Sequence, residues 1–308
     1  MKMVIAGGSG FLGTALARHF SGRSYEVVII SRAPEPDADF RSVWWDGKTL
    51  GDWTKELEHA DVLINLAGKS VDCRYHRKNR AEILNSRLNA TCVLGRALAS
   101  LRARPKVWIN ASSATIYRAS WKHLQTEEST DIGDDFSMTV CKKWEEAFFA
   151  FPFRDVRPLI LRTAITLGRE GGALVPFKRL AQARLGGPMG PGTQWFSWIH
   201  EFDFCRAIEW LIQNPKASGI YNLTSPQPVT NRTFLQQVRR ALKISLGIGL
   251  PGWCLALGAF VIRTETELVL KSRKVYPKRL LQEGFEFRFS NVGSALDDLF
   301  GRGRPQVN

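Results

Sequence analysis

Residues 2–13 read KMVIAGGSGFLG, a short apolar run that leads into a series of glycines. Residues 2–6 have the apolar character of a buried parallel strand, and residues 11–20 carry apolar side chains at helical spacing. Glycines at positions 7, 10 and 13 permit backbone angles and a close approach that a Cβ atom would block. The stretch therefore predicts a strand, a tight turn and a helix.

The same turn is a candidate anion site. The first amides of a helix have no partner inside the helix, and the positive end of the helix dipole lies beside them. The spacing G-x-x-G-x-x-G between a strand and a helix is typical of a turn that binds the pyrophosphate of a dinucleotide. An ordinary glycine-rich turn is the alternative. The expected cofactor-binding residues here are Gly7, Ser9, Gly10, Phe11, Leu12 and Gly13.

The end of the second predicted strand, residues 27–30, bears on the choice of cofactor. Ser31 and Arg32 follow it, and no acid occurs until Glu35. An acid at this point binds the ribose 2′-hydroxyl of NAD, whereas an arginine accommodates the 2′-phosphate of NADP. Ser31 and Arg32 therefore favour NADP(H) over NAD, unless Arg32 is only a surface charge.

Further apolar runs alternate with helical patterns as far as residue 161. Strands are expected at residues 43–45, 61–67, 106–110 and 156–161, and helices at residues 80–99 and 137–149. This order predicts βαβ units, hence an α/β Rossmann fold with a doubly wound parallel sheet.

We expect residues 1–168 to form an NADP-binding Rossmann domain, to which segments around residues 196–224 return. Residues 169–308 are expected to form mainly a smaller substrate-binding lobe. Its predicted elements are helices at residues 202–213 and 231–242, then a tail with a helix, a short strand at 285–289 and a last helix.

The chain is basic, with 43 Lys and Arg against 29 Asp and Glu and a net charge of +14. Such a charge attracts anions. The basic residues stand singly or in pairs, with no run of six or more, which favours a cationic solvated surface over a nucleic-acid site.

The cysteines indicate free thiols in a reducing, cytoplasmic compartment. Their number is odd, and no two have metal-ligand or redox spacing, so we predict no metal site. Residues 1–10 contain no signal peptide pattern. The five are Cys73, Cys92, Cys141, Cys205 and Cys254.

Residues 244–262 carry no charge over 19 positions, a length that could span a bilayer. Gly247, Gly249 and Pro251 interrupt them. The pattern favours a buried or interfacial helix pair over a membrane-spanning helix.

Several later segments resemble the extended short-chain dehydrogenase/reductase superfamily. They are Asn65-Leu66-Ala67-Gly68, ASSATIY at residues 111–117 and WIHEFD at residues 198–203. The resemblance is closer to an atypical epimerase-like subgroup of largely unassigned substrate. Its marks include Ser86-Arg87, CKKWE at 141–145, residues 186–200, PKRL at 277–280 and GFEF at 284–287.

The resemblance implies that Asn65, Leu66, Ala67 and Gly68 line the cofactor. We place Arg87 and Arg162 in the same cofactor site. It also implies a homodimer through the helices at residues 80–99 and 137–149.

The chemistry of this superfamily uses a Tyr for proton transfer, a Lys four residues later and a Ser that binds the substrate oxygen. By resemblance, Ser113 fits the last role and Lys142 the second. Met138 stands where the Tyr is expected, so the pair is not intact. A phenol has a pKa of about 10 and needs a neighbouring cation to act as a base. Tyr117 is the candidate substitute, or else a packing aromatic.

Residues 186–198 are expected to form part of a substrate wall. Gln194, Trp195 and Trp198 offer an amide and flat aromatic faces that suit a sugar or a base, although they also suit an ordinary core. His200 is a candidate acid, base or substrate contact, or a support for the loop.

The sequence thus predicts an NADP(H)-dependent oxidoreductase or epimerase-like enzyme. Its substrate would be a small polar molecule such as a nucleotide sugar. The alternatives are a non-catalytic NADP(H)-binding redox sensor or regulatory protein, and a reductase anchored to a membrane surface through residues 244–262.

Overall fold

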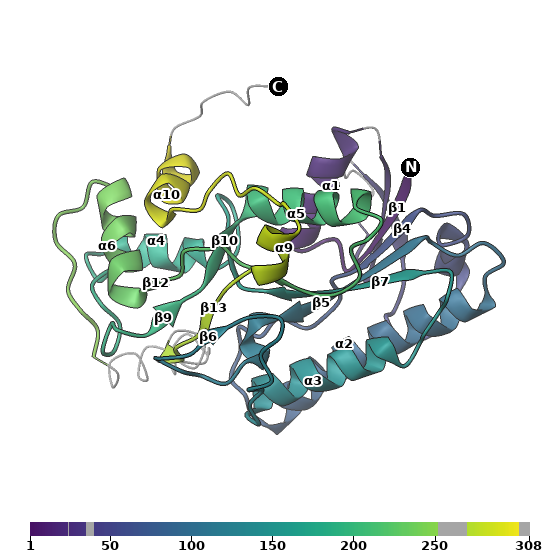
Figure 1. The fold of residues 1–308 in the computed structure, drawn as a ribbon, viewed down its shortest axis with the longest axis horizontal. Coiled ribbons are helices and arrows are strands. Elements are labelled where there is room, and N and C mark those ends of the chain that lie inside the picture. The colour runs from purple at the N-terminus through teal and green to yellow at the C-terminus, as the bar shows by residue number, and fades with distance from the viewer. Residues whose placement is uncertain (24, 35–39, 252–269, 302–308) are drawn as a thin grey trace.

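A computed structural model describes residues 1–23, 25–34, 40–251 and 270–301. Its centre is a seven-stranded sheet in the order β11-β7-β5-β4-β1-β2-β3, in which every neighbouring pair is parallel (Figure 1). The order reverses between β1 and β4, as in doubly wound folds, so the predicted fold class is confirmed. The strands are β1 (Lys2–Ala6), β2 (Glu26–Ser31), β3 (Arg41–Trp44), β4 (Val62–Asn65), β5 (Val107–Ser113), β7 (Arg157–Thr163) and β11 (Gly219–Leu223).

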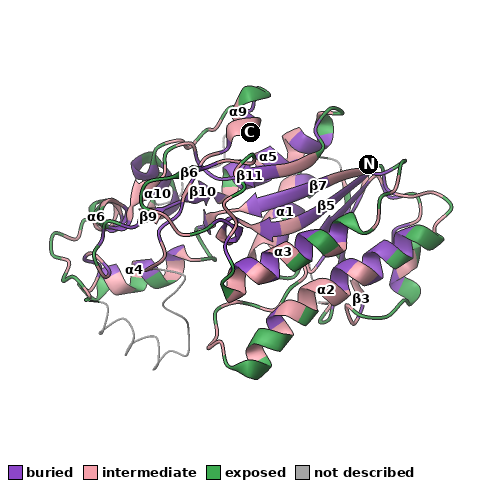
Figure 2. Ribbon diagram, turned by 60° about the horizontal axis from the view of Figure 1, so that its bottom comes forward, coloured by how far each residue is buried: buried purple, intermediate pink, exposed green. Residues whose placement is uncertain are grey.

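Successive strand side chains point to opposite faces of the sheet, so apolar strands present two apolar faces. Helices cover both of them. Met3 and Ile5 of β1 pack with α1 (Phe11–Ser21) and α5 (Glu201–Gln213). Val4 and Ala6 pack on the other side, with α2 (Arg77–Ser100) and α3 (Phe136–Phe149). Figure 2 shows the central strands β5 and β7 largely buried, while α2 and α3 carry both buried and exposed residues.

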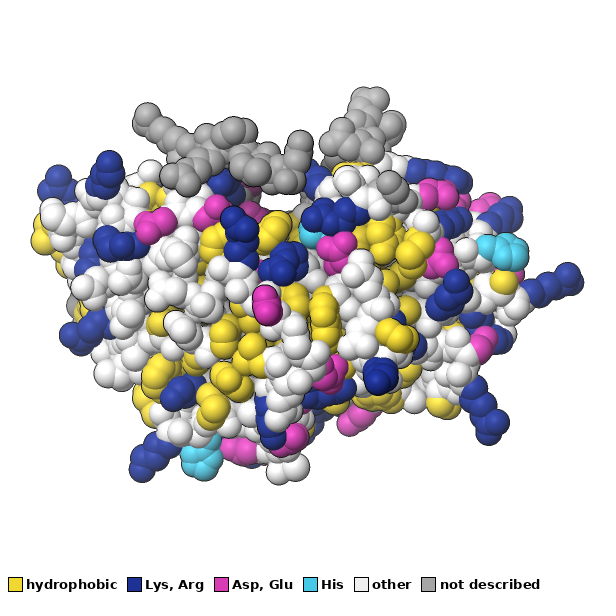
Figure 3. All heavy atoms as spheres, turned by 45° about the horizontal axis from the view of Figure 1, so that its top comes forward, with side chains coloured by type: hydrophobic (Ala, Val, Ile, Leu, Met, Phe, Trp, Pro, Cys, Tyr) yellow, Lys and Arg dark blue, Asp and Glu magenta, His cyan; other side chains and the backbone are white. Residues whose placement is uncertain are grey.

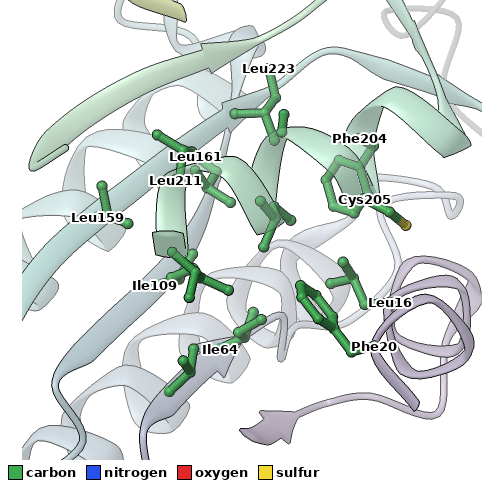
Figure 4. Packing of buried hydrophobic residues seen from close by; sticks show 14 of the residues in the cluster. Leu16, Phe20, Ile64, Ile109, Leu159, Leu161, Phe204, Cys205, Leu211 and Leu223 are labelled. Atoms are coloured by element: carbon green, nitrogen blue, oxygen red, sulfur yellow. The ribbon is translucent and has the colours of Figure 1, made fainter. Parts of the chain in front are cut away.

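The core under α1 and α5 joins segments that are far apart in the sequence. Figure 4 shows Leu16 and Phe20 of α1 beside Phe204 of α5, with Ile64 and Ile109 of the sheet beneath them. All five side chains are buried. Removing such a side chain leaves a cavity that typically costs about 2–5 kcal/mol, so this packing fastens α5 to the first half of the chain.

A second lobe has its own apolar core. Phe177, Phe196 and Phe234 lie in contact at its centre. Its helices are α4 (Leu174–Gln182), α6 (Asn231–Ala241) and α10 (Val292–Phe300).

In the described part of the chain, three short strand pairs lie outside the central sheet. β6 (Leu124–Gln125) pairs with β13 (Lys274–Val275), so the first half of the chain contacts the second directly. The other pairs are β8 (Ile165–Leu167) with β10 (Trp198–His200), and β9 (Trp195–Phe196) with β12 (Val229–Thr230). The remaining elements are α9 (Lys278–Gln282) and the 3₁₀ turns η1 (Asp52–Glu56) and η2 (Ala114–Ile116).

The strand predicted at residues 285–289 is wrong. These residues run as a loop between α9 and α10. The backbone N–H groups of Arg288 and Phe289 donate to the buried carboxylate of Asp203 on α5, at 3.0 and 2.7 Å, instead of to a neighbouring strand. Phe285 packs into the core under α5. The alternating apolar pattern therefore comes from a loop that docks on a helix.

The apolar segment at residues 244–262 lies largely outside the described residues, as does Cys254. Its described part, residues 244–251, is a loop rather than the expected helix, because its backbone bonds with residues 187–190. Among the described residues, no helix combines the length and apolar character needed to cross a membrane.

Candidate functional site

The glycines of the first turn serve different purposes. Gly7 has a φ of +73°, and a Cβ there would lie 2.7 Å from the Cα of Ala67. A Cβ on Gly13 would lie 2.4 Å from the backbone of Gly8. Both positions are therefore glycine for reasons internal to the fold.

Gly10 is different. Its φ of −89° is open to any residue, and a Cβ there would meet no atom within 4 Å. Neither backbone strain nor a described neighbour requires glycine at this position. A ligand that approaches the backbone closely would require it.

Gly10 is the N-cap residue of α1, immediately before its first helical residue. The first backbone bond of the helix runs from the Thr14 N–H to the Gly10 carbonyl at 2.9 Å, and no side chain caps the helix. The earlier amides are therefore free to bind an anion. Phe11 and Leu12 provide amides at this point, while the Phe11 ring packs against the loop at Gly168 and the Leu12 side chain against the core.

An open pocket extends from this turn along the carboxyl ends of β1, β2, β3 and β4. Eight of the predicted cofactor residues line it, namely Gly7, Ser9, Gly10, Ser31, Arg32, Leu66, Ala67 and Gly68. Seven further residues that were not predicted from the sequence also line it: Trp45, Asp46, Gly47 and Lys48 after β3, and Ser86, Asn89 and Ala90 on α2. Ser86 belongs to the Ser86-Arg87 mark of the epimerase-like subgroup, but no local motif marks the other six, because only the sheet order brings β3 and α2 to this edge.

Ser31 connects the glycine turn to the end of β2. Its buried hydroxyl donates to Ser9 Oγ at 3.0 Å and accepts the N–H of Ala33 at 3.2 Å. Arg32 lies between Ser31 and Ala33 in the sequence and is exposed, and no described residue forms an ion pair with it. The turn thus presents a guanidinium at the pocket.

Asn65 and Arg87 do not line the pocket but hold the loop that does. Asn65 donates to Asn110 Oδ1 at 2.7 Å and accepts the Ala67 N–H at 3.0 Å. Arg87 donates to the carbonyl of Lys69 at 3.1 Å and lies over the ring of Trp144. Both residues therefore support the backbone of residues 66–69.

The predicted cofactor role of Arg162 does not fit its position. Its guanidinium is buried and forms two bonds to the Glu145 carboxylate, at 2.9 and 2.8 Å. Ser112 Oγ donates to the same carboxylate at 2.6 Å. Burial opposes the charge of Arg162, but the bonds to Glu145 outweigh it and raise the pKa of Arg162. Its role is to join β7 to α3.

Tyr117 has no exposed surface. Its hydroxyl donates to Asn222 Oδ1 at 2.8 Å and accepts a bond from Arg162 at 3.0 Å. Burial raises the pKa of Tyr117, which makes the phenolate harder to form. This placement favours a packing role over proton transfer.

Ser113 and Lys142 lie on neighbouring elements at the carboxyl edge of the sheet. Ser113 ends β5, is half-buried, and accepts the N–H of Thr115 at 3.2 Å. Lys142 is a half-exposed residue of α3, with its Nζ 3.6 Å from the Asp134 carboxylate. Met138, at the usual tyrosine position, is buried against Gly133. The arrangement offers a hydroxyl and an ammonium, without a phenol from Met138.

Three of the four predicted substrate residues are buried and bonded within the protein. Gln194 donates to the Met189 carbonyl at 2.8 Å, and Trp198 to the Gln227 carbonyl at 3.1 Å. His200 accepts the N–H of Phe202 at 3.0 Å and so caps α5, and burial lowers the pKa of His200 to about 4. These positions favour the core and loop-support alternatives.

Trp195 is the exception, because it is only partly buried. It donates to the Trp121 carbonyl at 3.0 Å, and the ammonium of Lys274 lies 4.3 Å from its ring centroid.

The described residues bear on the expected absence of a metal site, and one face of the molecule bears on the expected absence of a basic nucleic-acid patch. No group of three or more His, Cys, Asp or Glu side chains in that part of the chain could hold a metal ion. On the face drawn in Figure 3, Lys and Arg side chains are spread out, with acidic side chains among them.

Comparison with known proteins agrees with this geometry. Residues 3–142 match the NAD dependent epimerase/dehydratase family, and residues 250–299 match a domain of unknown function, DUF1731. The chain is 33% identical over 307 residues to the epimerase family protein SDR39U1 of Bos taurus, which covers 97% of this chain and 99% of the relative.

Two solved structures extend the comparison. A crystal structure of human epimerase family protein SDR39U1 (isoform 2) with NADPH has a TM-score of 0.88 and 30% identity, covering 97% of this chain and 99% of that one. A nucleoside-diphosphate sugar epimerase from Corynebacterium glutamicum has a TM-score of 0.78 and 28% identity, covering 98% of this chain and 58% of that one. The resemblance noted in the sequence is therefore confirmed, and the chain belongs to the NAD-dependent epimerase/dehydratase family, among the SDR39U1-like epimerase family proteins.

Proposed function

We propose that this protein binds NADP(H) in the pocket at the N-terminus of α1 and catalyses hydride transfer with a small polar substrate, such as a nucleotide sugar. The observation that carries the proposal is Gly10, a glycine that neither the backbone conformation nor a described neighbour requires. The NADPH in the similar human structure and the sugar-nucleotide activity named for the C. glutamicum protein support the two ligand classes.

The residues of the pocket fit the parts of this cofactor. The first amides of α1 bind the diphosphate, and Arg32 binds the 2′-phosphate. Asn65 holds the Ala67 amide, so that the loop at residues 66–68 keeps its shape against the ligand.

A bound nicotinamide supplies or accepts the hydride. The Ser113 hydroxyl, at the end of β5, donates a hydrogen bond to the substrate oxygen, and the Lys142 ammonium adds positive charge from α3. The proton that accompanies the hydride passes between the substrate oxygen and solvent water in this proposal. Neither Met138 nor Tyr117 carries it, because one has no ionisable group and the other has no exposed surface.

The test is a binding titration with Gly10→Val. Because a Cβ at Gly10 meets nothing, the variant should unfold like the wild type, while its affinity for NADPH falls by roughly a hundredfold or more. Gly22→Val, at the other end of α1, is the matched control, because a Cβ there comes no closer than 3.7 Å to another atom. Equal NADPH affinity in the wild type and Gly10→Val would overturn the proposal.

A second candidate, a non-catalytic NADP(H)-binding sensor, is favoured by the positions of Met138 and Tyr117. Incubation of the protein and NADPH with a panel of carbonyl compounds and UDP-sugars separates the two. Tight binding without turnover on any compound supports the sensor, whereas turnover that Ser113→Ala lowers supports the enzyme.

A further inference from the structure

Three charged residues line the pocket at its β2 and β3 end: Arg32, Asp46 and Lys48. The other lining residues in the described part of the chain are neutral. Ser31 and Trp44 are register partners on the parallel strands β2 and β3, so Arg32 and the turn at residues 45–48 leave the sheet side by side. Among the described lining residues, two cations stand against one carboxylate, which is one net positive charge.

The turn that carries Lys48 is held in place although it lies at the surface. Asp46 accepts the N–H groups of Lys48 and Thr49 at 2.7 and 2.8 Å, and Gly47 takes a φ of +72°. Arg96 of α2 donates to the Lys48 carbonyl at 3.1 Å. The backbone of Lys48 is therefore positioned at the edge of the pocket, whatever its side chain binds.

The negative charge of Asp46 offsets one of the two cations, so the net charge of these three residues depends on Lys48. Bonds from the amide of Thr49, outweighing the small effect of burial, lower the pKa of Asp46, so its carboxylate is charged near neutrality. A carboxylate in the pocket repels a phosphate. With Arg32 alone, the opposite charges of Arg32 and Asp46 would cancel, and this end of the pocket would not attract an anion.

We propose that Lys48 is a second cation for the 2′-phosphate of the adenosine ribose, and that Arg32 and Lys48 together determine the preference for NADP(H) over NAD(H). Within the described ranges, no residue forms an ion pair with the side chain of either cation. A phosphate monoester carries a charge of about −1.5 to −2 near neutral pH, which one cation beside a carboxylate does not balance. This inference rests on the proposed function, because it assumes that the pocket binds a dinucleotide.

The experiment is isothermal titration of the full chain with NADPH, NADH and 2′,5′-ADP. For Lys48→Gln, we expect affinity for NADPH and for 2′,5′-ADP to fall roughly tenfold, while affinity for NADH changes by less than about twofold. Lys216→Gln, which removes an equally exposed charge beyond α5, is the matched control and should change none of the three. The dependence of NADPH affinity on salt should become shallower in Lys48→Gln alone.

A compensating variant tests the charge argument itself. Asp46→Asn keeps an oxygen that can accept the amides of the turn but removes the negative charge. In the Lys48→Gln background it should recover most of the lost affinity for NADPH. No recovery would mean that Lys48 acts by something other than net charge.

The outcomes separate this inference from the proposed function. Wild-type protein that binds neither dinucleotide overturns both. Wild-type protein that binds NADPH, together with a Lys48→Gln variant of unchanged affinity, leaves the function standing and makes Lys48 a solvated surface residue. An equal loss for NADPH and NADH also overturns the inference, because the contact would then be to a part that both molecules share.

Discussion

Arg162 of β7 and Glu145 of α3 form a two-bond ion pair inside the protein, with nitrogen–oxygen distances of 2.9 and 2.8 Å. Both side chains are nearly free of solvent, at 5% and 9% exposure. The pair sets α3, and with it Lys142, against the carboxyl edge of the sheet. Ser112 and Tyr117 satisfy further atoms of the pair, which is what a buried pair needs to offset its loss of hydration.

Glu145→Gln should lower the free energy of unfolding by about 3–5 kcal/mol, because it leaves the Arg162 charge buried without a counter-ion. Urea denaturation followed by circular dichroism measures the change. Asp52→Asn is the control, because Asp52 and Lys55 form an exposed pair that should contribute nothing measurable. Equal midpoints for wild type and Glu145→Gln would show that the pair is not needed for stability.

Tyr117→Phe should leave turnover unchanged. It removes a hydroxyl that bonds only to Asn222 and Arg162 among the described residues. The cost should appear in stability instead, at about 1–3 kcal/mol, because two buried polar groups lose a partner. Steady-state kinetics beside thermal unfolding checks both parts, and a large loss of turnover at normal stability would restore Tyr117 to the chemistry.

Stability should fall as the pH drops from about 6.5 towards 4. Burial lowers the pKa of His200 from 6.5 to about 4. The unfolded chain therefore binds a proton in this range before the folded protein does, so the contribution of neutral His200 is complete above pH 6.5 and is lost on acidification. His200→Asn keeps a capping side chain for α5 without titrating. Its unfolding midpoint should change less over this range than that of the wild type, and parallel curves would contradict the assignment.

Gly7→Ala should destabilise the fold by about 1–3 kcal/mol, because Gly7 is in the left-handed region and the added methyl meets the backbone of Ala67. Gly10→Ala should unfold normally and show its effect only in dinucleotide binding. Differential scanning calorimetry in the absence of nucleotide separates the two. A destabilised Gly10→Ala would show that the space beside Gly10 is filled by protein.

The elements that local pattern specifies were predicted well. The strand, glycine turn and helix at residues 2–21 depend on apolar spacing and on glycine stereochemistry, both of which are properties of neighbouring residues. The strand-helix alternation implied the parallel order of the sheet, because right-handed crossovers leave few other arrangements. The strand predicted at residues 285–289 was wrong. The alternation of apolar and polar residues there accompanies a loop whose amides bond to Asp203, and not pairing with a neighbouring strand.

Sequence alone therefore determined the fold class, through the alternation of strands and helices, and the glycine turn and the cation at Arg32, which lie within one βαβ unit. The tertiary structure decided which polar residues face the pocket. It buried Tyr117, Arg162 and His200 in internal bonds, and it brought Lys48 beside Arg32 across two strand ends. Which residues become hydrogen-bond partners or neighbours across long stretches of sequence depends on the packing of distant segments. The spacing of residues along the chain does not encode it.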